Sequence, residues 1–199
     1  IEAVKMGVHW LEFDVVISKD RKVVVSHEPW MSSSLCTTPD GKPVTDGRKL
    51  SLFRMDYDEI KKYDCGKRTD RCFRKQKSVS SYKPLLSEVF HEIENLILIN
   101  KLPEVQYCIE IKSFKILEGK YQPGPEEFSE LVYDLICQSK IKNRVMVISF
   151  DRRILQQFQK LDNGIKTGLT FLNLYSVQTN IKKLGFVPEE DLAVIYNLA

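Results

Sequence analysis

Short apolar runs alternate along this chain with longer segments whose apolar residues recur every three or four positions. The short runs are typical of buried strands, and the three-to-four spacing is typical of helices that bury one face. Runs that are apolar nearly throughout indicate an α/β fold with a parallel sheet covered by helices. The expected strands are 8–17, 23–27, 107–112, 144–150, 166–171 and 192–196, and the expected helices are 56–63, 85–98, 125–139, 152–161 and 177–184.

This strand count bears on the architecture. A closed (β/α)8 barrel, or TIM barrel, needs eight strands and about 250 residues. With 199 residues and six expected strands, we predict a single domain over 1–199 that is incomplete at both ends. The first residues begin a short helical segment without an initiator Met or a capping residue, which indicates a chain cut at its N-terminus. An open doubly wound sheet competes with this prediction, but its glycine-rich first turn is absent.

The composition of the chain argues against several kinds of partner and binding site. The net charge of +3 is spread as mixed Lys, Arg, Asp and Glu, so there is no basic stripe for nucleic acid. No apolar run approaches the roughly 20 residues that a membrane-spanning helix needs. The five cysteines are odd in number and lack zinc spacing, which disfavours both a full disulfide framework and a Cys-based metal site. A local Cys65–Cys72 bond is the pairing we consider.

Two carboxylates, Glu12 and Asp14, stand two residues apart in an otherwise apolar strand, and period two puts them on one face. A later strand places Glu110 and Lys112 in the same way. Ionised groups on a buried face are costly unless they are paired or bound to metal. Three carboxylates without sulfur suit one hard divalent cation, Mg²⁺ or Ca²⁺. From spacing alone, a structural ion-pair network without chemistry is an equal alternative.

His27 ends the second expected strand and opens a long loop, about 28–55, that is rich in Pro, Gly, Ser and Thr. Long loops in compact domains are usually functional, and barrel enzymes keep catalytic groups at the carboxyl ends of their strands. An imidazole there could act as general acid or base, although a lone His at a strand end is more often structural. His9 and His91 are expected to be structural or surface residues. Trp30 and Phe150 could line a substrate pocket or belong to the core.

Five motifs in one order resemble the glycerophosphodiester phosphodiesterase family, and their joint order is more specific than any one of them. The first carries Glu-x-Asp in a strand, the second ends in Ser-His-Glu-Pro, the third opens a barrel helix, the fourth carries Glu-x-Lys, and the fifth ends a strand in Ser-Phe-Asp. They occupy residues 7–15, 18–29, 83–89, 109–112 and 147–151.

The resemblance implies a (β/α)8 barrel of the phosphodiesterase type and metal-dependent hydrolysis of a small glycerophosphodiester to glycerol 3-phosphate and an alcohol. By the same resemblance Glu12, Asp14 and Glu110 would hold one divalent cation, Mg²⁺ or Ca²⁺. His27 would be one of two catalytic histidines, and Lys112 would help to neutralise the phosphate. The oligomeric state and the compartment, whether periplasmic, secreted or cytoplasmic, stay open.

The chain also departs from the family pattern. The His-Arg-Gly motif that supplies the second histidine and a phosphate-binding arginine does not occur, and we expect it before Ile1. Glu28 stands where the family often has Asp. The last strands, with a late aromatic wall, are missing as well. Three alternatives follow: a sphingomyelinase D-like phospholipase, a descendant that binds phosphoesters without turnover, and a plain α/β binding domain without metal.

Overall fold

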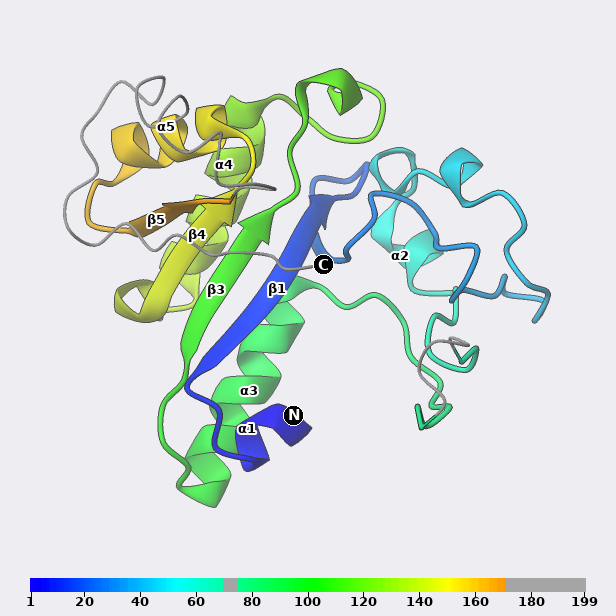
Figure 1. Cartoon of the computed structure of the whole chain (residues 1–199), viewed down its shortest axis with the longest axis horizontal. Coiled ribbons are helices and arrows are strands. Elements are labelled where there is room, and N and C mark those ends of the chain that lie inside the picture. Colours follow the sequence, from blue (N-terminus) through cyan, green and yellow to red (C-terminus); the bar gives the residue numbers. More distant parts are fainter. Residues whose placement is uncertain (70–74, 171–199) are drawn as a thin grey trace.

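The computed structural model describes residues 1–69 and 75–170 (Figure 1). The expected helix 177–184 and strand 192–196 lie outside these residues, as does Phe171 at the end of another expected strand. The α-helices are α1 (Glu2–Lys5), α2 (Tyr57–Ile60), α3 (Leu86–Asn100), α4 (Pro125–Gln138) and α5 (Arg152–Leu161). The strands are β1 (Trp10–Ile17), β2 (Val23–Val25), β3 (Gln106–Ile111), β4 (Val145–Ser149) and β5 (Lys166–Leu169). Short 3-10 turns cover Gly47–Lys49, Leu52–Arg54, Lys115–Leu117 and Lys142–Arg144.

The strands form one sheet in the order β2-β1-β3-β4-β5. β1, β3, β4 and β5 are parallel, as the alternation of strands and helices predicts. The expectation of an all-parallel sheet was wrong for β2, which pairs antiparallel with β1. The polar turn that joins β1 to β2 is too short for the crossover that parallel neighbours need, so these two strands form a hairpin.

The helices α3, α4 and α5 cover one face of this sheet. One apolar core joins alternate residues of β1 and β3 to the inner sides of the three helices. In β1 that core takes Val15 and Ile17, so Glu12 and Asp14 lie on the other face. Within residues 1–69 and 75–170, helices cover this one face, which is the arrangement of a barrel wall and differs from the doubly wound alternative, in which both faces are covered. Figure 1 shows α3 and α4 on one side of β1, β3 and β4.

Helix boundaries follow local chemistry. α4 begins with Pro125 directly after Gly124, a position where the missing proline N–H is not needed. α5 begins after Asp151, whose carboxylate accepts a hydrogen bond from the backbone N–H of Arg153. α3 ends at Lys101, which adopts the left-handed conformation. In the described part of the chain, none of these helices has the length and apolarity needed to cross a membrane.

The segment between β2 and α3 has a small core of its own. Met31, Leu52 and Tyr57 pack there against Val16 and Val24 of the hairpin. The expected helix 56–63 is a single turn, α2, within this segment. The expected loop 28–55 is therefore the larger part of a packed insertion.

A disulfide bond joins Cys36 to Cys65 in this insertion, which corrects one expectation. The local Cys65–Cys72 pairing was wrong, because Cys65 is bonded to Cys36. Thr37 and Asp64, the neighbours of the two cysteines, pair through backbone hydrogen bonds that bring the thiols together. Cys36 and Cys65 lie 29 positions apart, so their pairing depends on how the segment between them folds. Closeness in sequence therefore favoured the wrong partner.

Candidate functional site

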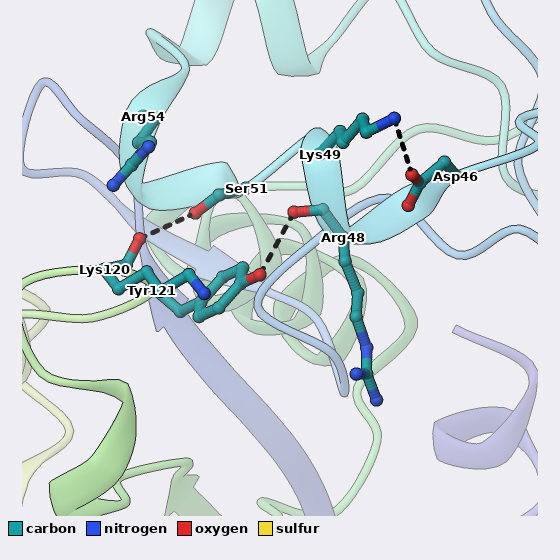
Figure 2. A pocket seen from close by; sticks show the side chains of 7 residues that line it. All are labelled: Asp46, Arg48, Lys49, Ser51, Arg54, Lys120 and Tyr121. Atoms are coloured by element: carbon teal, nitrogen blue, oxygen red, sulfur yellow. Dashed lines mark hydrogen bonds and ion pairs between the residues drawn. The ribbon is translucent and has the colours of Figure 1, made fainter.

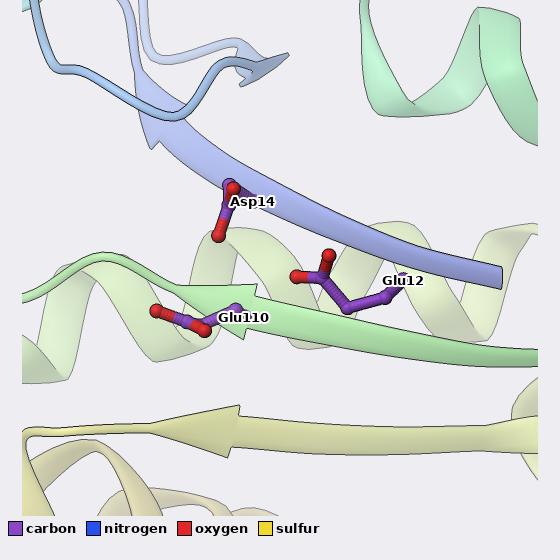
Figure 3. A group of neighbouring side chains, drawn as sticks. All are labelled: Glu12, Asp14 and Glu110. Atoms are coloured by element: carbon purple, nitrogen blue, oxygen red, sulfur yellow. The ribbon is translucent and has the colours of Figure 1, made fainter. Parts of the chain in front are cut away.

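Glu12, Asp14 and Glu110 come together on two neighbouring strands (Figure 3). The parallel register sets Asp14 directly beside Glu110, and Glu12 lies one pleat earlier on the same face of β1. One carboxylate oxygen from each lies within 4.8 Å of the others. The three predicted metal ligands are therefore adjacent in the fold. Their role as ligands stays a prediction.

The three carboxylates of this group repel one another. Burial first, and then the neighbouring carboxylates of Asp14 and Glu110, raise the pKa of Glu12 to about 7. Glu12 is the most exposed member of the three, whereas Glu110 is almost fully buried. Without a cation, the protein therefore favours a proton on Glu12.

Lys112 supplies the positive charge that the sequence predicted. Its Nζ lies 3.0 Å from Asp14 Oδ1 and 2.5 Å from Glu110 Oε1. Glu110 Oε1 is buried, and this ion pair with Lys112 is the contact that compensates its charge. Burial lowers the pKa of Lys112, but its two carboxylate partners outweigh burial and raise the pKa overall.

The donor set fits a hard divalent cation. It consists of carboxylate oxygens from three side chains that lie within 4.8 Å of one another, and such oxygens are the ligands that hard divalent ions take. Three carboxylates against one ammonium leave two negative charges, which a single divalent ion would neutralise. Ion pairing to Lys112 alone, the structural alternative, leaves the pKa of Glu12 raised.

His27 lies close to this group for a reason different from the one expected. β2 runs antiparallel, so its end returns along β1 and the Ser26 N–H donates a 2.9 Å hydrogen bond to the Asp14 carbonyl. His27 follows at once, with its side chain 69% exposed and its Nδ1 3.6 Å from Glu28 Oε1. Within residues 1–69 and 75–170, Nε2 of His27 forms no hydrogen bond, so it is free to meet a ligand. His9 and His91 are exposed side chains away from this group.

The two candidate pocket aromatics differ in their surroundings. Phe150 lies 5.8 Å from Lys112 Nζ and stacks on Phe114, and both rings line a cavity of about 310 Å³ at the ends of β3, β4 and β5. Trp30 instead packs edge-on against Tyr121, and the Arg48 guanidinium lies over the Trp30 ring, 5.3 Å from its centroid. Phe150 is thus a lining residue next to the carboxylates, and Trp30 anchors the insertion.

A hydrogen-bond network that sequence reasoning missed fixes this cavity. Asp151 accepts from Ser113 Oγ at 2.8 Å, and Ser113 Oγ accepts from Gln122 Nε2 at 3.0 Å. Gln122 Oε1 in turn accepts from the Phe114 N–H at 3.0 Å. The only sequence signal was Asp151 at a helix start, which indicates a cap as readily as a site.

A second cavity, of about 380 Å³, lies where the insertion meets the segment after β3 (Figure 2). Arg48, Lys49, Arg54 and Lys120 contribute four cationic side chains to its lining. Figure 2 shows Arg48, Lys49 and Arg54 pointing in different directions, with Lys49 directed at Asp46. These charges do not converge on one point, so the cavity makes the surface basic without forming a defined anion site.

Comparison with known proteins gives a consistent answer. The family model described as "Glycerophosphoryl diester phosphodiesterase family" matches residues 1–195. No protein among the curated ones matches the sequence.

Solved structures resemble the chain in fold. A glycerophosphoryl diester phosphodiesterase structure from Silicibacter pomeroyi has a TM-score of 0.77 at 20% identity and covers 92% of this chain. An Oleispira antarctica phosphodiesterase in complex with the product sn-glycerol-3-phosphate has 0.66 at 19% identity and also covers 92%. A glycerophosphodiester phosphodiesterase from Parabacteroides distasonis has 0.60 at 21% identity and covers 93%. The chain spans 65%, 63% and 60% of these three proteins, respectively.

Proposed function

The chain belongs to the glycerophosphoryl diester phosphodiesterase family, and from this membership we propose that it hydrolyses glycerophosphodiesters to glycerol 3-phosphate and an alcohol, using one divalent cation. The observation that carries the proposal is the carboxylate group of Glu12, Asp14 and Glu110 on the face of the sheet opposite its helices. The inner face of a barrel is where such enzymes gather reactive groups at the strand ends. The product in the Oleispira antarctica complex, sn-glycerol-3-phosphate, agrees with this substrate class.

We assign the cation to Glu12, Asp14 and Glu110, with Mg²⁺ and Ca²⁺ as the two ions that such oxygen ligands favour. When bound, a divalent ion polarises the phosphoryl oxygen and offsets negative charge as it develops. The single positive charge of Lys112 already serves two of the three carboxylates, so the substrate's negative charge requires a further cation.

Two side chains, Lys112 and His27, would carry out the remaining chemistry. Lys112, between Asp14 and the Phe150 ring, would pair with a non-bridging phosphate oxygen and orient it. His27 would give or take a proton at the oxygen that leaves or attacks, through the Nε2 that its contact with Glu28 leaves open. Phe114 and Phe150 would border the bound diester on its apolar side and limit the access of water.

The test is release of glycerol 3-phosphate from glycerophosphoethanolamine by the full-length protein, with a chelator and then with added Mg²⁺ or Ca²⁺. We expect release that the chelator stops and one of the two ions restores. Glu110→Gln should abolish it, while Glu92→Gln, an exposed carboxylate on α3, should leave it unchanged. Release that is indifferent to chelator would refute the metal assignment. Substrate binding without release under any ion would favour a phosphoester-binding protein, and cleavage of sphingomyelin instead would favour the phospholipase alternative.

A further inference from the structure

Residues 83–85 add a short extended segment to the open edge of β2. Val24 and Leu85 form an antiparallel bridge, and the Val25 N–H donates a 2.8 Å hydrogen bond to the Pro84 carbonyl. Counting on in this register places Lys83 opposite Ser26, and the β1–β2 register places Ser26 opposite Asp14. Side chains that lie opposite one another share a face of the sheet. Lys83 therefore extends from the same face as the carboxylate group, on the side away from Lys112.

The ammonium of Lys83 has an unusual environment. The residue is half-buried, and burial lowers the pKa of its ammonium, which the charge of Glu28 only partly offsets. Within the described residues no carboxylate lies at ion-pair distance from Nζ. Its hydrogen-bond partner is Ser26 Oγ, at 2.6 Å. An ammonium that is partly removed from water and has no ion-pair partner lowers the stability of the folded protein, which points to a role beyond packing.

A series of contacts links Lys83 to the turn that carries His27. Ser26 Oγ accepts from Lys83 Nζ and donates a 2.6 Å hydrogen bond to the Glu28 carbonyl. Glu28 Oε1 lies 3.6 Å from His27 Nδ1. The two hydrogen bonds therefore span the turn that carries His27 and hold both of its flanking residues.

We propose that Lys83 is a positioning residue for His27, acting through Ser26 and Glu28, an inference that rests on the proposed diesterase function. The short chain of hydrogen bonds, from Lys83 through Ser26 Oγ to the Glu28 carbonyl, fixes the turn at the level of Asp14. Nothing in this arrangement requires Lys83 to touch the substrate.

Two carboxylates, Glu28 and Glu88, and the Tyr57 hydroxyl surround this unit. Glu28 faces both Lys83 and His27, and the Asp14 backbone carbonyl holds the Ser26 N–H. On the other side, the Tyr57 hydroxyl lies 3.4 Å from the Lys83 carbonyl and donates to Glu88 at 2.9 Å. Removal of the Lys83 ammonium takes away the donor that Ser26 Oγ accepts from, so the turn that carries the imidazole loses one of its two hydrogen bonds.

The first test follows the His27 ring by NMR over a pH series, in wild type, Lys83→Met, Lys83→Arg and Ser26→Ala, without substrate. Lys160→Met, an exposed lysine on α5, is the matched control. We expect the ring signals of His27 to shift in both Lys83→Met and Ser26→Ala. Lys83→Arg and the control should give the wild-type ring signals. Unchanged His27 signals in folded Lys83→Met protein would overturn the proposal, whether or not the protein proves to be a diesterase.

The second test measures kcat and KM on glycerophosphoethanolamine. Loss of positioning should lower kcat by about tenfold to a hundredfold with little change in KM. Because Lys83 acts through Ser26, the double variant should be no worse than the poorer single variant. A large rise in KM for Lys83→Met, with normal kinetics for Ser26→Ala, would overturn the proposal in favour of direct substrate contact. Inactive wild-type protein would refute the diesterase function while the NMR result still decides the role of Lys83.

Discussion

Lys112 Nζ lies 3.0 Å from Asp14 Oδ1, an ion pair between neighbouring strands, and the same ammonium contacts Glu110 at 2.5 Å. The side chain of Lys112 is 11% exposed and that of Glu110 is 4% exposed. One buried cation thus balances two carboxylates of the candidate metal site. The third carboxylate, Glu12, has no such partner among the described residues and carries a raised pKa.

Replacement of Lys112 tests this balance. In Lys112→Met the pair of carboxylates loses its cation, and breaking a buried pair in this way costs about 3–5 kcal/mol of stability. We expect a lower melting temperature without metal, a larger recovery when a divalent cation is added than in wild type, and turnover reduced by about a hundredfold or more. Calorimetry and the glycerol 3-phosphate assay measure these effects. Equal melting temperatures of Lys112→Met and the control Lys160→Met would contradict the prediction.

Removal of a single ligand should separate binding of the ion from folding. Glu12→Ala and Glu110→Ala are expected to abolish cation-dependent hydrolysis while circular dichroism shows the fold retained. Titration calorimetry with Mg²⁺ and Ca²⁺ should show weakened binding in both variants and normal binding in Glu92→Gln. Activity that survives in either Ala variant at low cation concentration would exclude that carboxylate as a ligand.

His27→Ala should lower turnover by about 10² or more, which is the usual contribution of a positioned general acid or base. Binding of the cation should be unaffected, because His27 is not among the carboxylate ligands. His91→Ala, which alters an exposed histidine on α3, serves as the control. A rate within a factor of a few of wild type would make His27 a structural residue.

The raised pKa of Glu12 predicts how pH affects stability. In the unfolded chain the Glu12 carboxyl ionises near its usual pKa of 4.5. In the folded, metal-free protein it stays protonated up to about pH 7 and is ionised above that. The metal-free protein therefore loses stability as pH rises from about 4.5 through about 7. A divalent cation binds the ionised form, so its addition should raise the melting temperature more at pH 8 than at pH 5. An equal shift at both pH values would argue against Glu12 as a ligand.

The Cys36–Cys65 disulfide predicts a stability effect in the insertion. Loss of a bond that closes a loop of this size typically costs about 2–4 kcal/mol. We expect Cys36→Ser to lower the midpoint of urea unfolding, and Cys108→Ser, which changes a free thiol, to leave the disulfide intact. Mass mapping of a digest without reductant should recover Cys36 joined to Cys65. Recovery of a Cys65–Cys72 peptide would contradict the structure.

Local sequence pattern was enough to predict a large part of this molecule. Alternation of apolar segments predicted β1, β3, β4 and β5 and the helices α3, α4 and α5, because burial acts on each segment through its own periodicity. Period two also placed Glu12 beside Asp14 on one face, and the order of five motifs identified the family that the comparisons confirmed. The fold class was confirmed in the same way.

The sequence by itself determined which segments are strands and which of their residues share a face, since both follow from contacts between near neighbours in the chain. The antiparallel direction of β2 follows from the short turn after β1, which is also a local feature of the sequence. Tertiary structure alone decided the partner of Cys65 and the hydrogen bond between Lys83 and Ser26. Both depend on how a long insertion closes on itself, with Leu52 and Tyr57 in its core. Such packing joins residues far apart in sequence, so no local pattern encodes it.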